Sequence, residues 1–420
     1  MKRSKLAGAL LFVCVFAVIA YLPAQRLPFI ADDYLQIKLG RDYGPMHSWP
    51  ALLRDPLYRC RSTSVVLTYW TERVAGLNSV AFNFSSLLLH VANCALVFAF
   101  GAWRAVGWKL AFATAAFFAV AEGHQEAVIW YAAIPELLVF LFSAASCLAF
   151  VFSITRSGSR LLWYGIALVS FLFALASKES GVAVGGALLL ACVVERMPLR
   201  RSVLLLTPFG VLACLYAYAI FASSSDILHF HDGAFSLNAP FPKTIFNSSI
   251  RLLWFWGIAA IVVLATWNRA AARTLLPASL CWVGISLFPY SFLTYMNRVP
   301  SRHTYLASLG LSILVGAAVL SVAGRRRSWG IALITVIIAH NCIYLWTKKQ
   351  AQYEQRAEAT EQLLQACRRN SAKIRIDCFP YSRWIAQYAV EIGAKRDWDE
   401  SMWQIRSACR PDETAIIVED

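Results

Sequence analysis

Two adjacent carboxylates, Asp32 and Asp33, follow the first long apolar segment of the sequence at a distance of about ten residues. Neighbouring residues on a helix point about 100° apart, so one carboxylate of such a pair faces a given group while the other contacts something else. In a partly desolvated cleft, a carboxylate with a raised pKa can act as a general base toward a lipid-embedded substrate. The structural alternative for the same residues is a helix N-cap, a position that Asp favours.

A second concentration of charge lies between two apolar segments, where Glu122, His124 and Glu126 fall within one short turn. Ionisable side chains this close to hydrocarbon are costly, on the order of 3 kcal/mol at a bilayer centre, and usually face a cavity. A divalent metal site is an alternative, because imidazole and carboxylate are metal ligands, but these residues match no defined ligand spacing. The sequence allows a divalent metal without requiring one, and it leaves the cofactor unknown.

Two cations, Lys178 and Arg302, stand at the ends of apolar segments. They are candidates for a clamp on an anionic lipid headgroup, because guanidinium offers bidentate phosphate geometry and ammonium offers a point charge. Arg59 and Arg61 are further candidates for the same clamp. The alternatives are snorkelling interfacial anchors and, for Lys178, an ion pair with Glu179.

The composition determines what kind of molecule must position these residues. Of 420 residues, 59% are hydrophobic and 15% are charged, whereas soluble proteins average about 45–50% apolar and 25% charged residues. The chain is therefore predicted to be an integral membrane protein. Intrinsic disorder, a disulfide-rich miniprotein and an ordinary soluble enzyme are excluded, because each needs a more polar or much shorter chain.

A membrane-spanning helix needs about 20 predominantly apolar residues. The sequence contains eleven such segments, and we predict an all-α polytopic protein with about eleven transmembrane helices. The third segment is short enough for a re-entrant or tilted helix. The segments cover residues 6–22, 80–102, 108–121, 129–153, 161–177, 181–195, 203–222, 250–267, 275–290, 304–322 and 329–346.

Basic residues gather at alternate junctions between these segments. The positive-inside rule then predicts a cytoplasmic N-terminus. We expect a multi-pass protein of a bacterial inner membrane. The same rule also explains the formal net charge of +15 without a nucleic-acid partner. A cleaved signal peptide is the alternative for the first segment, and it leaves the same regions outside. The basic residues at the N-terminus and at these junctions number fifteen: Lys2, Arg3, Lys5, Arg104, Lys109, Arg156, Arg160, Arg196, Arg200, Arg201, Arg269, Arg273, Arg325, Arg326 and Arg327.

The regions predicted to lie outside are two long loops, at about 23–79 and 223–249, and the tail. We expect a membrane domain over 1–346 and a small helical extracytoplasmic domain over 347–420. The tail is predicted to form two amphipathic helices joined by a tight turn, at 384–391 and 398–409. It also contains Cys367, Cys378 and Cys409 in a compartment that permits disulfides. One pair can bridge there, and spacing does not say which.

Taken in chain order, the outer motifs resemble the membrane part of the transmembrane-and-TPR protein O-mannosyltransferase family and its bacterial relatives. The similarity extends over roughly residues 20 to 310. The matching motifs are the Asp pair, Arg61, Leu87-Leu88-Leu89-His90 with Asn93, His124-Gln125-Glu126-Ala127-Val128 with Trp130, Ser177-Lys178-Glu179, and Arg302-His303-Thr304-Tyr305-Leu306 with Ser308, Leu309 and Gly310.

The resemblance implies a GT-C glycosyltransferase that takes a sugar, mannose being one candidate, from a polyprenyl-phosphate-linked donor. The acceptor would be an extracytoplasmic protein hydroxyl, a glycan or a lipid. In that scheme Asp32 or Asp33 is the catalytic base, with Asp32 preferred as the leading acid of the pair. The implied substrate-binding residues are Lys178 and Arg302 at the donor phosphate, His124 and Glu126 along the cavity, and Arg61 and Glu179 beside them.

The sequence departs from the family pattern at several points. An Arg-Pro pair is replaced by Arg61-Ser62, a His-Pro pair by Glu122-Gly123, and an Arg-Tyr step by Arg302-His303. The long TPR array is absent, and the tail resembles at most one degenerate repeat, which cannot bury its own face alone. These departures leave the identity of the sugar and of the acceptor open.

Two other classes of function remain as alternatives. A transporter or flippase of an anionic lipid or solute would require charges at mid-membrane depth and broken helices repeated in two halves. The candidate residues lie at the outer ends instead, and His90, the main buried exception, is of a type more often packed or hydrogen-bonded than a proton relay. A non-catalytic assembly protein would use the tail for interactions and the Asp pair as helix caps.

Overall fold

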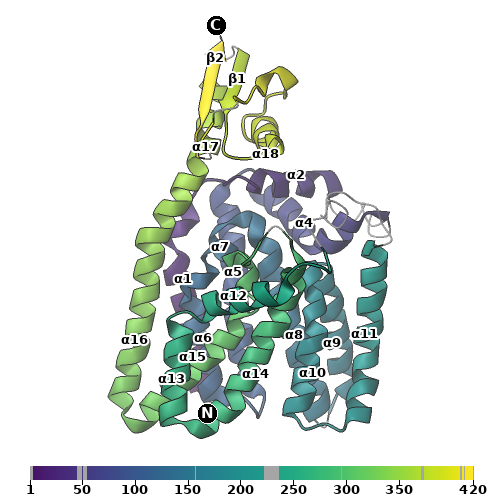
Figure 1. Cartoon of the computed structure of the whole chain (residues 1–420), viewed down its shortest axis with the longest axis vertical. Helices are drawn as coiled ribbons and strands as arrows, with labels where there is room; N and C mark the ends of the chain where they lie inside the picture. The colour runs from purple at the N-terminus through teal and green to yellow at the C-terminus, as the bar shows by residue number, and fades with distance from the viewer. Residues whose placement is uncertain are drawn as a thin grey trace.

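The computed structural model describes residues 3–44, 50, 54–156, 158–221, 236–294, 296–369, 373–406, 409, 410 and 412–419. Apolar helices form a bundle along the long axis of the molecule (Figure 1). Each of the eleven predicted apolar segments coincides with a helix. These helices are α1 (Arg3–Tyr21), α5 (Ser79–Ala99), α6 (Gly107–Val120), α8 (Ile134–Thr155), α9 (Arg160–Leu175), α10 (Ala183–Val194), α11 (Leu199–Phe221), α13 (Trp256–Trp267), α14 (Arg269–Leu287), α15 (Ser308–Arg325) and α16 (Arg327–Tyr344).

The polytopic all-α prediction is confirmed, while the number of crossings stays a prediction. In the described part of the chain, seven helices are long and apolar enough to cross a membrane. The amphipathic helix α12 (Phe241–Leu253) and α13 add an eighth span if this pair, bent by 79°, is counted as one. Three further apolar helices are shorter than a full crossing: Gly107–Val120, Arg160–Leu175 and Glu179–Val194.

Helix α15 runs through the centre of one half of the bundle, where it contacts α6, α13, α14 and α16. Glycines permit its closest contacts, as is common where membrane helices approach each other. A Cβ atom added to Gly316 would lie 2.7 Å from the backbone nitrogen of Thr114 on α6, and one added to Gly310 would lie 2.6 Å from the carbonyl oxygen of Ser279 on α14. The other half is built around α8, which is buried along most of its length and packs against α5 and α9.

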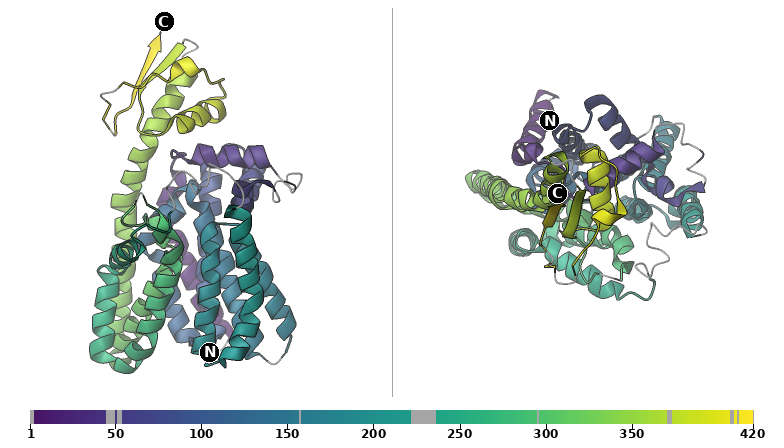
Figure 2. Two further views of the ribbon diagram at one scale, coloured as in Figure 1. Left: turned by 45° about the vertical axis from the view of Figure 1, so that its right-hand side comes forward. Right: turned by 90° about the horizontal axis from the view of Figure 1, so that it is seen from above.

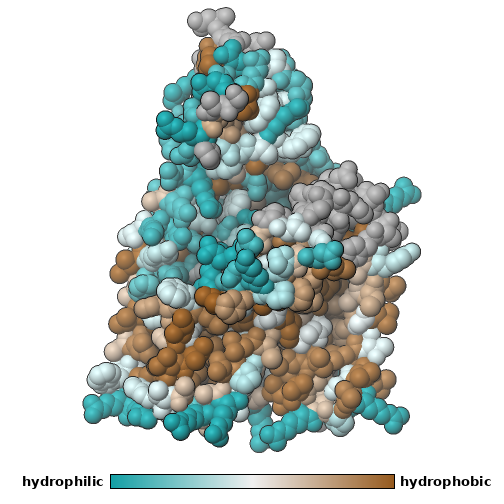
Figure 3. All heavy atoms as spheres, in the orientation of Figure 1, coloured by the Kyte–Doolittle hydropathy of each residue, from teal (hydrophilic) through white to brown (hydrophobic). Residues whose placement is uncertain are grey.

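The two ends of the molecule differ in character. On the face shown in Figure 3, a hydrophobic belt covers the bundle and a hydrophilic rim lies at its lower end. The N-terminus lies at this lower end and the C-terminus at the other (Figure 1). At the upper end α2 (Asp33–Tyr43) and α4 (Pro56–Ala75), both from the predicted loop 23–79, lie over the bundle. Part of the predicted loop 223–249 forms helix α12, while residues 222–235 lie outside the described residues.

The C-terminal domain is carried on a continuation of α16. A π-helical turn, Leu345–Lys349, leads into α17 (Gln350–Arg369), so the predicted boundary at 346 falls inside a continuous helical segment. The domain lies above the bundle (Figure 2), where α18 (Arg383–Tyr388) contacts α2. A disulfide joins Cys378 to Cys409 and leaves Cys367 as a free, buried thiol.

The helical prediction for this tail is only partly correct. Helix α18 and the following turn match the first predicted helix, but the described residues of the segment 398–409 contain a 3₁₀ turn at Glu400–Met402 and no α-helix. Its backbone N–H groups at Gln404 and Arg406 donate instead to carbonyl oxygens at positions 376 and 377, at 3.1 and 2.8 Å. Those carbonyls belong to β1 (Lys373–Cys378), which pairs antiparallel with β2 (Ala415–Glu419). The alternating Lys-Ile-Arg-Ile-Asp pattern, with both isoleucines fully buried, is the strand signal that the sequence prediction missed.

Candidate active site

Asp33 is a buried structural carboxylate at the start of α2. Its Oδ2 accepts a hydrogen bond from the backbone N–H of Ile30 and its Oδ1 from that of Ala132, both at 2.7 Å. Burial raises the pKa of Asp33 to about 8, although the two backbone hydrogen bonds oppose the shift. Both oxygens are therefore occupied in joining the first outer loop to the turn before α8.

Asp32 is placed differently, although it is the next residue in the chain. It is only partly buried, and its side chain makes no hydrogen bond to any residue that the structure describes. It occupies the N-cap position of α2 without capping the helix, so the N-cap alternative is wrong for this residue. Burial raises the pKa of Asp32, and the nearby positive charge of Arg302 lowers it. The residue before it, Ala31, is buried with φ at +42°, a left-handed conformation that L-residues rarely adopt and that is often found at functional sites.

Arg302 is held beside Asp32 by Glu126. The Glu126 carboxylate accepts hydrogen bonds from the Ser301 hydroxyl at 2.6 Å and from the backbone and guanidinium of Arg302, both at 3.1 Å. Burial raises the pKa of Glu126, but the hydrogen bonds from Ser301 and Arg302 outweigh it and leave the pKa below its usual value. The guanidinium also lies 4.8 Å above the ring of Trp130. Glu126 is therefore ionised and fixes the orientation of Arg302.

Lys178 belongs to a buried cluster centred on Glu136 of α8. The Glu136 carboxylate forms an ion pair with the Lys178 ammonium and lies 2.5 Å from Nδ1 of His303. It also accepts a hydrogen bond from the Tyr290 hydroxyl at 2.8 Å. The side chains of Glu136 and Lys178 are 2% and 11% exposed. The alternative of an ion pair between Lys178 and Glu179 is thus wrong, because Lys178 pairs with Glu136.

Glu179 pairs instead with Arg61 of α4. The guanidinium lies 2.9 Å from the carboxylate and 3.5 Å from the carbonyl oxygen of Ser177. A backbone hydrogen bond from Thr63 to the carbonyl of Ala176, at 3.3 Å, joins the same two segments. Arg61 and Glu179 therefore attach α4 to the turn that carries Lys178.

His124 lies in the interior rather than on an open cavity. It is 0% exposed and packs against the ring of Tyr305 at 4.5 Å between centroids. Its Nε2 lies 2.6 Å from the Ser308 hydroxyl, which itself donates to the carbonyl oxygen of Tyr305. The imidazole N–H must therefore donate to Ser308. Tyr305 also lies 2.7 Å from Nδ1 of His90, whose other ring nitrogen faces the carbonyl of Ala119 at 3.1 Å.

These histidines belong to a hydrogen-bond network that fixes the helices beneath the outer turns. The polar residues of the resembling motifs thus divide into an inner, structural group and an outer group. Within the described ranges, no three or more His, Cys, Asp and Glu side chains are grouped so that they could hold a metal ion.

The outer group forms one connected region. Arg302 and His303 are neighbours in the chain and join the Glu126 cluster to the Glu136 cluster. Lys178 and Glu179 join the Glu136 cluster to Arg61 in the same way. Asp32 lies at one end of this region, where the positive charge of Arg302 lowers the pKa of the Asp32 carboxyl group.

No protein-family model and no curated protein matches this sequence, whereas several solved structures match the fold. The apo structure of ArnT from Cupriavidus metallidurans has a TM-score of 0.53 at 16% identity, covering 87% of this chain and 70% of that one. The oligosaccharyltransferase from Archaeoglobus fulgidus, tethered to an acceptor peptide, has a TM-score of 0.53 at 13% identity. The chain has the GT-C fold. The match to that oligosaccharyltransferase covers 88% of this chain but only 58% of the neighbour.

The GT-C fold predicted from the outer motifs is therefore confirmed. ArnT bound to undecaprenyl phosphate is a further GT-C neighbour, with a TM-score of 0.50 at 14% identity over 86% of this chain and 71% of that one. Identities this low establish the architecture, while the roles of individual residues rest on the geometry described above.

Sequence reasoning missed Glu136, Tyr290 and Ser301. Glu136 had a usable signal, because a single acid inside an otherwise apolar span normally needs a buried partner. Ser301 and Tyr290 had none, since isolated hydroxyl residues are common near helix ends. Their partners come from segments at least 110 residues away in the chain.

Proposed function

We propose that the protein transfers a sugar from a polyprenyl-phosphate-linked donor to an acceptor on the outer side of the membrane. The observation that carries the proposal is Asp32, a carboxylate with no hydrogen-bond partner among the described residues, beside the oriented guanidinium of Arg302 on a GT-C scaffold. A carboxylate of this kind is suited to accept a proton, and a fixed cation is suited to stabilise a phosphate.

The reaction assigns one role to each group. Asp32 takes the proton of the acceptor hydroxyl, whose oxygen attacks the anomeric carbon from the face opposite the phosphate. The bond between that carbon and the phosphate oxygen breaks, with inversion of configuration. The lipid phosphate leaves with the bonding electrons, and Arg302 stabilises its charge. Lys178 contributes less directly, because Glu136 compensates its charge while both hold the segment that carries Arg302.

The donor and the sidedness are part of the proposal. ArnT, which has the same fold, has been solved with undecaprenyl phosphate, and this supports a polyprenyl-phosphate donor. The basic junctions predict a cytoplasmic N-terminus. Helix α2, which begins directly after Asp32, and the C-terminal domain lie at the end opposite the N-terminus (Figure 1). The proposal assigns this end to the extracytoplasmic side. The resemblance to O-mannosyltransferases makes polyprenyl-phosphate mannose the first donor to test.

Transfer of labelled sugar from a panel of polyprenyl-phosphate donors to membranes containing this protein tests the proposal. Loss of a general base typically lowers the rate about 10²- to 10⁴-fold. The rate of sugar transfer by Asp32→Asn should therefore fall by that factor. The matched control is Asp42→Asn on the same helix, where Asp42 forms an exposed ion pair with Lys38 at 2.7 Å. The control should retain transfer. Full activity of Asp32→Asn, with normal membrane insertion, would contradict the proposal.

A further inference from the structure

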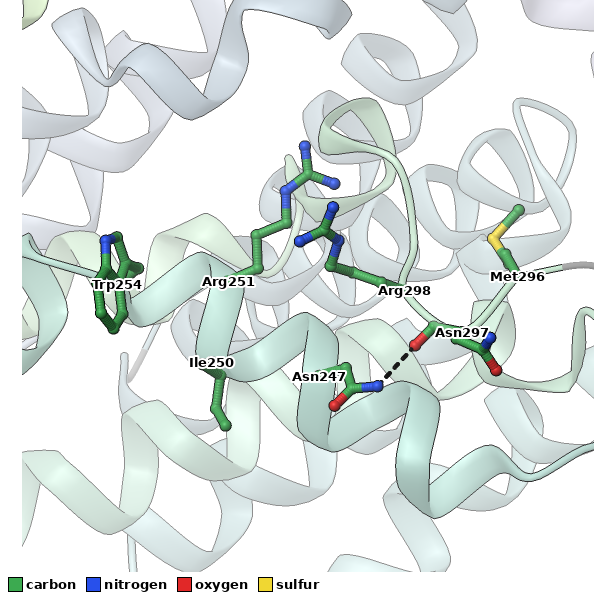
Figure 4. Close-up of a pocket in the computed structure, with 7 residues that line it drawn as sticks. All are labelled: Asn247, Ile250, Arg251, Trp254, Met296, Asn297 and Arg298. Carbon is green, nitrogen blue, oxygen red and sulfur yellow. Dashed lines mark hydrogen bonds between the residues drawn. The ribbon is translucent and has the colours of Figure 1, made fainter.

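A pocket of about 850 Å³ opens between α12 and the loop that precedes Arg302 (Figure 4). Its walls include Asn247, Ile250, Arg251 and Trp254 from α12 and Asn297 and Arg298 from the loop. None of these residues belongs to the Asp32 region described above, and none was singled out as a candidate by the sequence.

The pocket is held open by contacts between the loop and the helix. The Asn247 side chain donates to the carbonyl oxygen of Asn297 at 3.1 Å, and the Arg251 guanidinium donates to that of Val299 at 3.0 Å. The backbone N–H of Val299 donates to the hydroxyl of the buried Ser248 at 3.1 Å. The loop is therefore fixed along α12, and the pocket exists without a ligand to form it.

Two guanidinium groups converge in this pocket. Arg251 and Arg298 project to the same side of α12, with their guanidinium groups toward each other (Figure 4), and both residues are exposed. They lie close enough for their positive charges to repel each other. Within the part of the chain that the structure describes, neither forms an ion pair with a carboxylate. An anion bound between them would relieve this repulsion, and guanidinium groups match phosphate geometry.

The position of α12 indicates what carries the anion. Helix α12 lies across the bundle (Figure 1), near the upper edge of the hydrophobic belt (Figure 3). Its residues Phe246, Ile250 and Trp254 are 64%, 44% and 68% exposed, which is expected of a helix lying at a membrane interface. The guanidinium groups thus lie beside an apolar surface, where a phosphate attached to a lipid tail satisfies both features at once.

We propose that the pocket of Arg251 and Arg298 binds a phosphate group carried by a membrane lipid. The pocket adjoins the proposed reaction centre, because the charge of Glu126 acts on Arg251 and Val299 lies three residues before Arg302. The proposal does not depend on the proposed reaction. Two arginines that only anchored the helix would spread toward bulk headgroups. Here they converge on one preformed pocket.

The test uses the full-length protein in nanodiscs of phosphatidylcholine. Binding is measured for three probes: a labelled polyprenyl phosphate, labelled phosphatidylglycerol and inorganic phosphate. The double variant Arg251→Gln/Arg298→Gln should bind the lipid phosphate at least about 10-fold more weakly, because two charge-assisted contacts are removed. Lys243→Gln, an exposed charge on the same helix, is the matched control and should bind as the unaltered protein does. Arg298→Gln alone should weaken binding too, and it tests the site if the double variant does not fold.

The outcomes separate the possible sources of phosphate. Selective loss of polyprenyl phosphate binding supports the proposal and identifies the lipid as a polyprenyl one, while loss of phosphatidylglycerol binding supports it and identifies a phospholipid. Unchanged lipid binding in the double variant would overturn the proposal, and so would binding of inorganic phosphate alone or an equal loss in Lys243→Gln. Asp32→Asn should keep full lipid binding, so failure of the proposed reaction and failure of this site give different results.

Discussion

Replacing Glu136 by Gln is expected to destabilise the protein strongly while hardly changing the volume of the side chain. Glu136 compensates the ammonium of Lys178, contacts His303 at 2.5 Å and accepts the Tyr290 hydroxyl at 2.8 Å. The Gln carbonyl still accepts from Tyr290. What the substitution removes is the negative charge, and Lys178 remains as a buried cation without a counter-charge.

The magnitude follows from this burial. The Glu136 and Lys178 side chains are 2% and 11% exposed, so neither charge can be solvated by water. Removal of one member of a buried ion pair typically costs about 3–5 kcal/mol. At roughly 2 °C per kcal/mol for a large chain, the midpoint of thermal unfolding should fall by about 6–10 °C.

The assay is thermal unfolding of purified protein in one detergent. It is measured for Glu136→Gln, for Lys178→Met and for the double variant. Lys178→Met should be destabilising alone, because it leaves Glu136 uncompensated. The double variant Glu136→Gln/Lys178→Met should recover at least about 2 kcal/mol relative to the sum of the single variants, since it removes both buried charges.

An exposed ion pair provides the control. Arg41 donates three hydrogen bonds to the Glu72 carboxylate, at 2.5, 2.9 and 3.1 Å, but its side chain is 40% exposed. Glu72→Gln should therefore cost about 1 kcal/mol or less. If Glu136→Gln costs no more than this control, or if the double variant shows no recovery, the buried ion pair does not have the role assigned to it.

Three further predictions concern the base, the helix contacts and the C-terminal domain. The positive charge of Arg302 lowers the pKa of Asp32, so Arg302→Gln should raise that pKa and move the ascending limb of the transfer rate against pH to higher pH; an unmoved limb would contradict the contact. Gly316→Ala should destabilise the protein by about 1–3 kcal/mol in thermal unfolding, because its Cβ would overlap α6, whereas Gly324→Ala on the same helix meets open space and should not. Cys409→Ser should lower the free energy of unfolding of the C-terminal domain by about 2–5 kcal/mol, because it opens a disulfide that joins residues 31 positions apart. The tail should then be cleaved faster by protease while the bundle stays intact. Equal cleavage of the tail in the variant and the unaltered protein would refute the prediction.

The apolar pattern of the sequence predicted the bundle well, because a membrane helix must satisfy its own backbone hydrogen bonds and therefore needs a continuous apolar run. All eleven runs coincide with helices. The tail was harder, since its strands are short and their paired residues lie 37 to 46 positions apart in the chain. The amphipathic pattern over 398–409 predicted a helix. In the structure, backbone N–H groups of this segment instead donate to carbonyl groups of β1, and Cys409 forms the disulfide with Cys378.

For the candidate site, the types and order of the residues indicated which side chains are functional candidates. They did not indicate which hydrogen-bond or ion-pair partner each side chain has. Asp32 and Asp33 are indistinguishable in the sequence, yet one carboxylate accepts two backbone N–H groups and the other accepts none in the described structure. Lys178 and Glu179 are neighbours that pair with different residues, Glu136 and Arg61. Local sequence does not contain these choices, because each depends on a segment that the fold brings in from elsewhere.

The apolar runs of the sequence were sufficient to predict a polytopic membrane protein, because their length is a local property. The GT-C fold was implied by the resemblance of the outer motifs to a known family. Three features required the folded structure: which acid of the pair has no hydrogen-bond partner among the described residues, which cation is neutralised, and where two arginines meet. Electrostatic roles depend on distance and desolvation in three dimensions, and the same residue has a different role when a distant helix supplies its partner.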